Sequence, residues 1–165
     1  YRIGELLSKG AEIDAFGVGT RKGTSADRPY VDVIYKLCET MSESGKFSPI
    51  MKLSEGKATL PGRKQVFRFK DKKGNFAKDV IALADEKVNG EPLLIKVIEN
   101  GKITCDLPSL SEIRAAASEN LSKLPEKYKR LTDAPTYPVG LSPALEALIK
   151  KLRRKLTKTE VLNYP

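Results

Sequence analysis

The stretch Ile13-Asp14-Ala15-Phe16-Gly17-Val18-Gly19-Thr20 is a short apolar run that ends in two glycines and a hydroxyl. Ile3, Leu6 and Leu7 precede it at helical spacing, and Gly10 is the residue type that ends a helix in a left-handed conformation. The sequence therefore predicts a helix, then a strand over residues 13–16, then a glycine turn.

The glycine turn has the chemistry of a phosphate site. Gly17 and Gly19 lack Cβ atoms, so their backbone can adopt positive φ and their amides can approach an anion closely. The Thr20 hydroxyl is a further donor, and Arg21 follows at once. Glycine, hydroxyl and cation together favour a phosphomonoester. Because Gly-x-Gly turns are also common without a ligand, a plain tight turn stays open as the alternative.

The composition is that of a folded protein without histidine. The chain has 165 residues, 40% of them hydrophobic, which is enough to bury a core. No apolar run approaches the roughly 18 residues that span a bilayer, and the N-terminus has no signal-peptide pattern, so we expect a cytoplasmic protein with no membrane contact. Cys38 and Cys105 are expected to be free thiols rather than metal ligands. The lack of histidine excludes a Ser-His-Asp triad, a Cys-His pair and a phosphohistidine from this chain.

The net charge of +9 first indicates nucleic acid as a partner. Six basic residues lie in one short stretch, namely Lys150, Lys151, Arg153, Arg154, Lys155 and Lys158. A nucleic-acid surface would place aromatic residues among such cations, and residues 150–158 contain none. A solvated helix face is therefore favoured over nucleic-acid binding.

Strand and hairpin patterns fill the middle of the chain. Strands are predicted over residues 31–37, 47–53, 64–70, 79–83, 93–99 and 102–104. Pro49 favours an edge position for the second of them. Asn100-Gly101 is the pair that best accommodates positive φ in a two-residue hairpin turn. We therefore expect a mostly antiparallel sheet over residues 31–104.

Two helices are predicted after this sheet. Ser109 and Glu112 form a capping box before an apolar stripe made of Leu110, Ile113, Ala117, Leu121 and Leu124. Ser142 caps and Pro143 opens the last helix. Its apolar face consists of Leu145, Leu148, Ile149, Leu152 and Leu156.

Four stretches of the chain stand out together, namely residues 13–20, residues 33–37, residues 51–68 with Met51-Lys52-Leu53-Ser54-Glu55 and Leu60-Pro61-Gly62-Arg63-Lys64, and Tyr137-Pro138-Val139-Gly140-Leu141-Ser142. In residues, order and spacing they resemble the nicotinate phosphoribosyltransferase family. The resemblance covers nearly the whole chain and is to the C-terminal part of such an enzyme.

The resemblance implies a fold. It is an α/β fold with an incomplete segment of an irregular (β/α) barrel of the type II phosphoribosyltransferase kind. In this view residues 1–30 are a late helix, strand and phosphate loop of the barrel. Residues 31–108 are an antiparallel β-rich segment that packs on the barrel, and residues 109–165 are the two C-terminal helices.

The resemblance also implies a reaction. Nicotinate and phosphoribosyl pyrophosphate give nicotinate mononucleotide and pyrophosphate, coupled to ATP hydrolysis through a phosphorylated histidine. That histidine has no counterpart here, so no catalytic residue is expected in this chain and the chain alone is expected to be inactive. Mg²⁺ and ATP are implied for the complete enzyme and none for this chain alone. The implied partners are a missing N-terminal part or partner subunit, and further copies in a homo-oligomer of the complete enzyme.

The resemblance points to the glycine turn as the site of the donor's 5-phosphate, with Gly17, Val18, Gly19 and Thr20 as the binding residues. A barrel commonly builds a phosphate site from the loops after its last strands. Weaker candidates are Arg21, Lys52, Ser54 and Lys64, for which a structural role is the alternative. A second class of function stays open, namely a free-standing basic module that binds nucleic acid or protein without catalysis.

Overall fold

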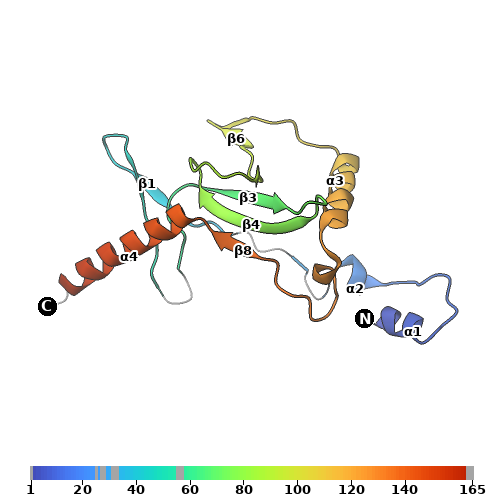
Figure 1. Cartoon of the computed structure of the whole chain (residues 1–165). Helices are drawn as coiled ribbons and strands as arrows, with labels where there is room; N and C mark the ends of the chain where they lie inside the picture. Colours follow the sequence, from blue (N-terminus) through green and yellow to red (C-terminus); the bar gives the residue numbers. More distant parts are fainter. Residues whose placement is uncertain (1, 25, 27–28, 31–33, 55–57, 163–165) are drawn as a thin grey trace. The chain divides into compact units, whose positions relative to one another are not determined.

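The computed structural model describes residues 2–24, 26, 29–30, 34–54 and 58–162 (Figure 1). The chain divides into two compact units, Tyr1–Lys36 and Leu37–Pro165. Residues 31–33 of the predicted strand 31–37 lie outside the described residues.

The first unit holds two short helices, α1 (Arg2–Ser8) and α2 (Thr20–Gly23). Gly10 has φ of 75°, and the Ala11 amide donates to the Leu6 carbonyl at 3.1 Å, so the predicted left-handed helix end is confirmed. The predicted strand over residues 13–16 is wrong, because this segment is irregular. A β-strand is stabilised by hydrogen bonds to a neighbouring strand, and none of the described segments pairs with residues 13–16.

The second unit is built on the hairpin of β3 (Lys64–Lys70) and β4 (Phe76–Leu83). Its antiparallel pairing confirms the predicted hairpin, although β4 begins three residues earlier than expected. β5 (Glu91–Pro92) pairs with β3, and β8 (Val139–Leu141) runs parallel to β4, giving the order β5-β3-β4-β8. Buried apolar side chains among the described residues of the unit include Phe67, Phe76, Ala82, Leu145 and Ile149.

Two further sheets have two strands each. β1 (Glu39–Met41) pairs with β2 (Phe47–Pro49), and β6 (Ile98–Glu99) pairs with β7 (Lys102–Ile103). In the β6–β7 turn, Asn100 has φ of 50° and Gly101 has φ of 75°. The predicted Asn-Gly turn with two positive φ values is therefore confirmed.

The single antiparallel sheet predicted over residues 31–104 is wrong. The described residues form three separate sheets, and β8 adds a parallel strand from outside that range. Residues 34–36 are not a strand, and Tyr35 is 92% exposed. Of the strand predicted over 93–99, only β6 at residues 98–99 is present. At Leu94 the Gln65 side chain stands in for a neighbouring strand, because it accepts a hydrogen bond from the Leu94 amide at 2.8 Å and donates one to the Leu94 carbonyl at 3.0 Å.

Helix α3 (Leu110–Lys123) confirms the predicted capping box but not a buried stripe. The Ser109 amide donates to Glu112 Oε2 at 2.7 Å, and the Glu112 amide donates to Ser109 Oγ at 3.4 Å. None of the helix's residues is buried, and Leu110 is 82% exposed. The short 3₁₀ helix η1 (Glu126–Tyr128) follows.

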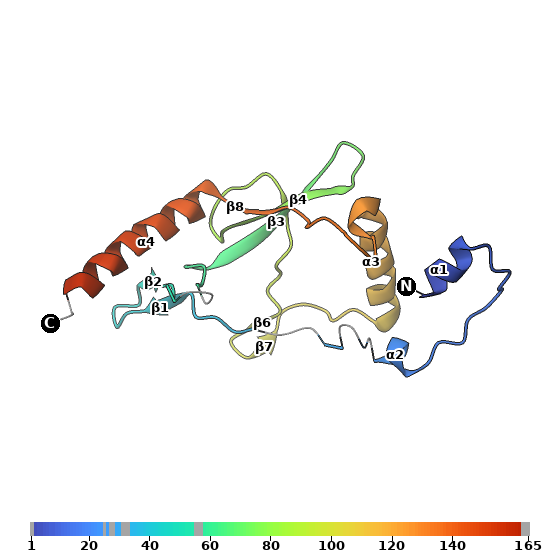
Figure 2. The same ribbon diagram turned by 90° about the horizontal axis from the view of Figure 1, so that it is seen from below.

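Helix α4 (Pro143–Leu162) follows directly on β8 in both views (Figures 1 and 2). The Leu145 amide donates to Ser142 Oγ at 3.2 Å, which confirms the predicted cap. Leu145 and Ile149 are buried, while Leu148, Leu152 and Leu156 are half-buried. The basic residues at 150, 151 and 153–155 are exposed, as predicted, and the side chain at 158 lies outside the described set.

The packing of α4 makes a prediction about stability. Because Leu145 is fully buried, Leu145→Ala is expected to lower the free energy of unfolding by about 2 to 5 kcal/mol. Lys151→Gln, on the exposed face of the same helix, is expected to change it by less than about 0.5 kcal/mol. Urea unfolding followed by circular dichroism measures both. Equal losses would contradict the assignment of the buried face.

Candidate functional site

The predicted phosphate residues lie in an open, exposed loop of the first unit. Thr20 begins α2, and its carbonyl accepts bonds from the amide and the hydroxyl of Thr24, both at 2.9 Å. Gly17 and Gly19 do not adopt the positive φ that their residue type allows. A Cβ atom added to either glycine would meet no atom within 4 Å. Nothing within the described chain therefore requires glycine at these positions.

The weaker candidates divide between the two units. Arg21 lies in α2, whereas Lys52, Ser54 and Lys64 belong to the second unit. The Lys64 ammonium donates to the Leu60 carbonyl at 2.9 Å and also to the Gly62 carbonyl. These bonds favour a structural role for Lys64. Lys52 and Ser54 are exposed and lie beside residues 55–57, which are outside the described set.

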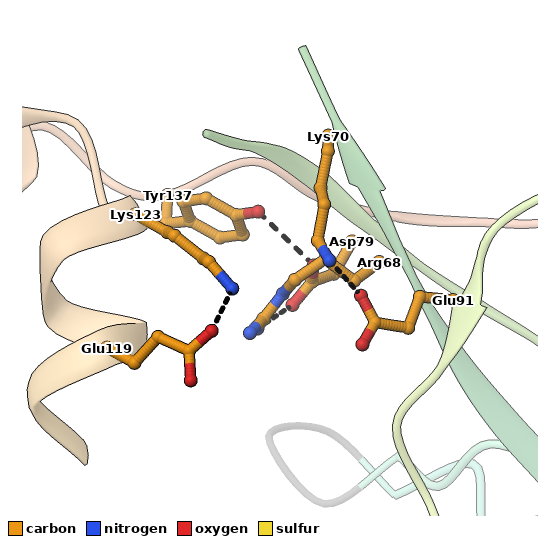
Figure 3. Close-up of polar contacts among 7 residues, drawn as sticks. All are labelled: Arg68, Lys70, Asp79, Glu91, Glu119, Lys123 and Tyr137. Atoms are coloured by element: carbon orange, nitrogen blue, oxygen red, sulfur yellow. Dashed lines mark hydrogen bonds and ion pairs between the residues drawn. The ribbon is translucent and has the colours of Figure 1, made fainter. Parts of the chain in front are cut away.

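A cluster of charged and aromatic side chains lies on one part of the second unit, and we call it the charged cluster (Figure 3). It gathers residues from β3, β4, β5, α3 and the segment before β8, namely Arg68, Lys70, Asp79, Glu91, Glu119, Lys123 and Tyr137. Asp79 is its centre. Arg68 Nε donates to Asp79 Oδ1 at 3.0 Å, and a second guanidinium nitrogen donates to Oδ2 at 2.8 Å.

Further contacts hold the Arg68–Asp79 pair in place. The Tyr137 hydroxyl donates to Asp79 Oδ1 at 3.2 Å, and the Asp79 amide donates to the Pro138 carbonyl at 3.0 Å. The Arg68 guanidinium lies 4.1 Å from the centre of the Phe76 ring, within the range of a cation–π contact. Asp79 is buried, and its carboxylate accepts three hydrogen bonds, which use most of the roughly four acceptor sites of such a group.

The electrostatics of the cluster follow from these contacts. The hydrogen bond to Asp79 raises the pKa of Arg68 above its ordinary value. Burial raises the pKa of Tyr137, and the Asp79 charge acts in the same direction. The Lys70 ammonium, 2.6 Å from Glu91, lowers the pKa of that carboxyl. These directions keep Arg68 and Glu91 charged and Tyr137 neutral at neutral pH.

Helix α3 contributes an ion pair of its own to the charged cluster. Lys123 lies 2.5 Å from Glu119 and lowers the pKa of that carboxyl, and the charge of Lys70 on β3 acts in the same direction. Figure 3 shows the Lys70–Glu91 pair on the sheet and the Glu119–Lys123 pair on α3. Each of these carboxylates is paired with a lysine, so the pairs offer no activated nucleophile or poised acid.

Sequence reasoning missed Asp79, although a signal was present. The predicted hairpin places position 68 opposite position 79, and opposite charges at facing positions of an antiparallel pair stabilise it.

Cys38 and Cys105 are free thiols, as predicted. In the described part of the chain, no three potential metal-ligating side chains come together. No helix there combines the length and apolar character needed to cross a bilayer.

The Arg68–Asp79 pair makes a second prediction. Asp79→Asn removes the charge that balances a guanidinium whose side chain is only 22% exposed, so we expect the free energy of unfolding to fall by about 2 to 4 kcal/mol. Tyr137→Phe is expected to cost about 1 kcal/mol, because it deletes one hydrogen bond. Urea unfolding gives both values.

Asp85→Asn is the matched control, since Asp85 is exposed and its loss should cost less than about 0.5 kcal/mol. If Asp79→Asn is as stable as this control, the pair does not hold the sheet together.

The chain is similar to known proteins over most of its length. Residues 87–149 match the family model of the nicotinate phosphoribosyltransferase C-terminal domain. The nicotinate phosphoribosyltransferase pncB2 of Mycobacterium tuberculosis is 37% identical over 92% of this chain and 32% of its own. The nicotinate phosphoribosyltransferase of Bacillus subtilis is 33% identical over 86% of this chain and 34% of its own.

A solved structure of a nicotinic acid phosphoribosyltransferase is also similar to this chain. The crystal structure of human nicotinic acid phosphoribosyltransferase matches with a TM-score of 0.56 and 30% identity, covering 66% of this chain and 26% of that one. The chain spans about a third of the length of the curated relatives it matches. The predicted resemblance is thus confirmed: this chain is similar, over most of its length, to the C-terminal part of the nicotinate phosphoribosyltransferases.

Proposed function

We propose that this chain is part of a nicotinate phosphoribosyltransferase, an enzyme of NAD biosynthesis. The observation that carries the proposal is the 37% identity to the Mycobacterium tuberculosis enzyme over 92% of this chain. Because only 32% of that relative is covered, the remaining residues of the active site would come from a part of the enzyme outside this chain. We place the reaction in the cytoplasm.

In the proposed reaction, nicotinate attacks ribose C1 of phosphoribosyl pyrophosphate, and pyrophosphate leaves. The contribution of this chain is the loop of Gly17, Val18, Gly19 and Thr20, which would hold the donor's 5-phosphate at the end of a barrel strand. Binding energy from this remote phosphate would position C1 for attack. The loop is exposed and open at both glycines, which leaves room for a ligand.

Coupling to ATP, with Mg²⁺, is assigned to the complete enzyme. The sequence contains no histidine, so a phosphorylated histidine would belong to another part of the protein, and this chain alone would be inactive. The described residues do not group potential metal ligands in threes or more, so no step is assigned to Mg²⁺ within this chain. Nothing in the comparisons favours the alternative of a free-standing basic module.

A chimera tests the proposed function. The first two thirds of the Bacillus subtilis relative, joined to this chain, is expected to form nicotinate mononucleotide from nicotinate and phosphoribosyl pyrophosphate in the presence of ATP and Mg²⁺, while this chain alone is not. Chromatography of the product measures the rate, and circular dichroism checks the fold. A folded chimera without activity, beside an active Bacillus subtilis enzyme, would refute the proposal. If the chimera does not fold, the two separate pieces are mixed and assayed in the same way.

The phosphate loop has its own test in the active chimera. Thr20→Val removes a hydroxyl at nearly constant volume and is expected to raise the KM for phosphoribosyl pyrophosphate roughly tenfold to a hundredfold. Gly19→Val should raise it further. Because a Cβ at Gly19 meets no atom of this chain within 4 Å, such a loss would report on the ligand rather than on the fold.

Ser8→Ala also removes a hydroxyl, which bonds only to the Glu5 carbonyl of its own helix, and should leave the KM unchanged. An unchanged KM in folded Thr20→Val would show that Thr20 is no phosphate ligand. An unchanged KM in Gly19→Val as well would show that residues 17–20 are only a turn.

A further inference from the structure

A cleft of about 330 Å³ lies in the second unit, away from residues 17–20 in the sequence. One wall comes from the segments on either side of residues 55–57, and the other comes from α4 and the end of β8. Five apolar residues line it, namely Met51, Ala58, Leu60, Leu141 and Ile149. Its volume is within the range of small-molecule pockets.

Hydrogen bonds hold the first wall in shape. The Lys52 amide donates to Thr59 Oγ1 at 2.8 Å, and the Thr59 amide donates back to the Lys52 carbonyl at 3.2 Å. The Lys64 ammonium binds the Leu60 carbonyl at 2.9 Å. This wall is therefore fixed at both of its ends.

The second wall is fixed by the cap of α4. The Ser142 hydroxyl donates to Glu86 Oε2 at 2.6 Å, and the Ser142 amide donates to the Ile81 carbonyl at 2.9 Å. Leu145 is fully buried below the first turn of the helix. A cleft between two anchored walls is formed before any ligand arrives, so little ordering cost opposes binding.

The charge around the cleft is asymmetric. Lys150 and Arg153, three residues apart and so on one side of α4, both line it. Their sequence neighbours Lys151 and Arg154 do not line it. Glu146 is the single acid in the lining that the structure describes, so the rim is net positive.

We propose that this cleft binds a small amphiphilic anion, meaning a flat apolar body that carries one carboxylate or similar group. The apolar body would lie against Leu60, Leu141 and Ile149, and the anionic group would lie between Lys150 and Arg153. Charge-assisted bonds from two cations at the edge of an apolar floor supply the affinity for such a ligand. The residues of this site belong to the second unit and do not include residues 17–20, and the proposal does not rest on the proposed enzymatic function.

The test uses the full 165-residue chain and the probe naphthalene-2-carboxylate, with neutral naphthalene-2-carboxamide as a matched ligand of the same shape. Isothermal titration calorimetry gives the affinity, and amide chemical shifts map the site. We expect saturable binding of the carboxylate, with shifts at residues 58–60 and 146–153. The carboxamide should bind about tenfold more weakly.

The chain offers a matched pair of variants. Lys150→Gln with Arg153→Gln should weaken carboxylate binding about tenfold, whereas Lys151→Gln with Arg154→Gln should change it less than twofold, although both remove the same charge from the same helix. Equal losses in the two double variants would overturn the proposal, because they would show binding to the general positive field. Shifts confined to the exposed stripe of α3, or no saturation at millimolar probe, would also overturn it.

Discussion

The Arg68–Asp79 pair is the interaction on which the second unit depends. Arg68 of β3 binds both oxygens of Asp79 on β4, so the pair joins the two central strands. The Asp79 carboxylate also accepts a hydrogen bond from the Tyr137 hydroxyl, and the Asp79 amide donates one to the Pro138 carbonyl. These two bonds hold the residues just before β8 against β4. Three residues after β8 begins, Ser142 caps α4. One buried aspartate therefore joins β3, β4 and the segment that leads into β8.

Local signals predicted the elements that local interactions hold together. The hairpin of β3 and β4, the turn at Asn100-Gly101 and the capping box at Ser109 depend on residues close in sequence, and all three are confirmed. The strands predicted at 13–16 and 31–37 depend on partners or covering surfaces far away in the chain. An alternating pattern shows that a segment can pair, but not that a neighbour is present.

The candidate site residues also differ in whether the local sequence predicts them. Residue types alone mark residues 17–20 as suited to phosphate, and this stays a prediction about a ligand, because no contact among the described residues requires these glycines. The charged cluster was missed because its members are dispersed over five segments, which only the register of β3 and β4 and the position of α3 bring together (Figure 3).

Two of the stretches that resemble the nicotinate phosphoribosyltransferases, residues 51–68 and 137–142, have structural roles in the second unit. Residues 137–142 connect β8 and α4 to β4 through hydrogen bonds. Gly62 has φ of 73°, and a Cβ atom added there would lie 3.2 Å from a methyl group of Leu83, so this position favours glycine. The unit nevertheless leaves the stripe of α3 exposed, together with Ile98 and Ile103 of the β6–β7 pair. A two-stranded hairpin is marginal by itself in water, and apolar surface gains free energy when it is covered. Exposed apolar elements around a firmly tied centre are what we expect of a part of a larger enzyme, as proposed here.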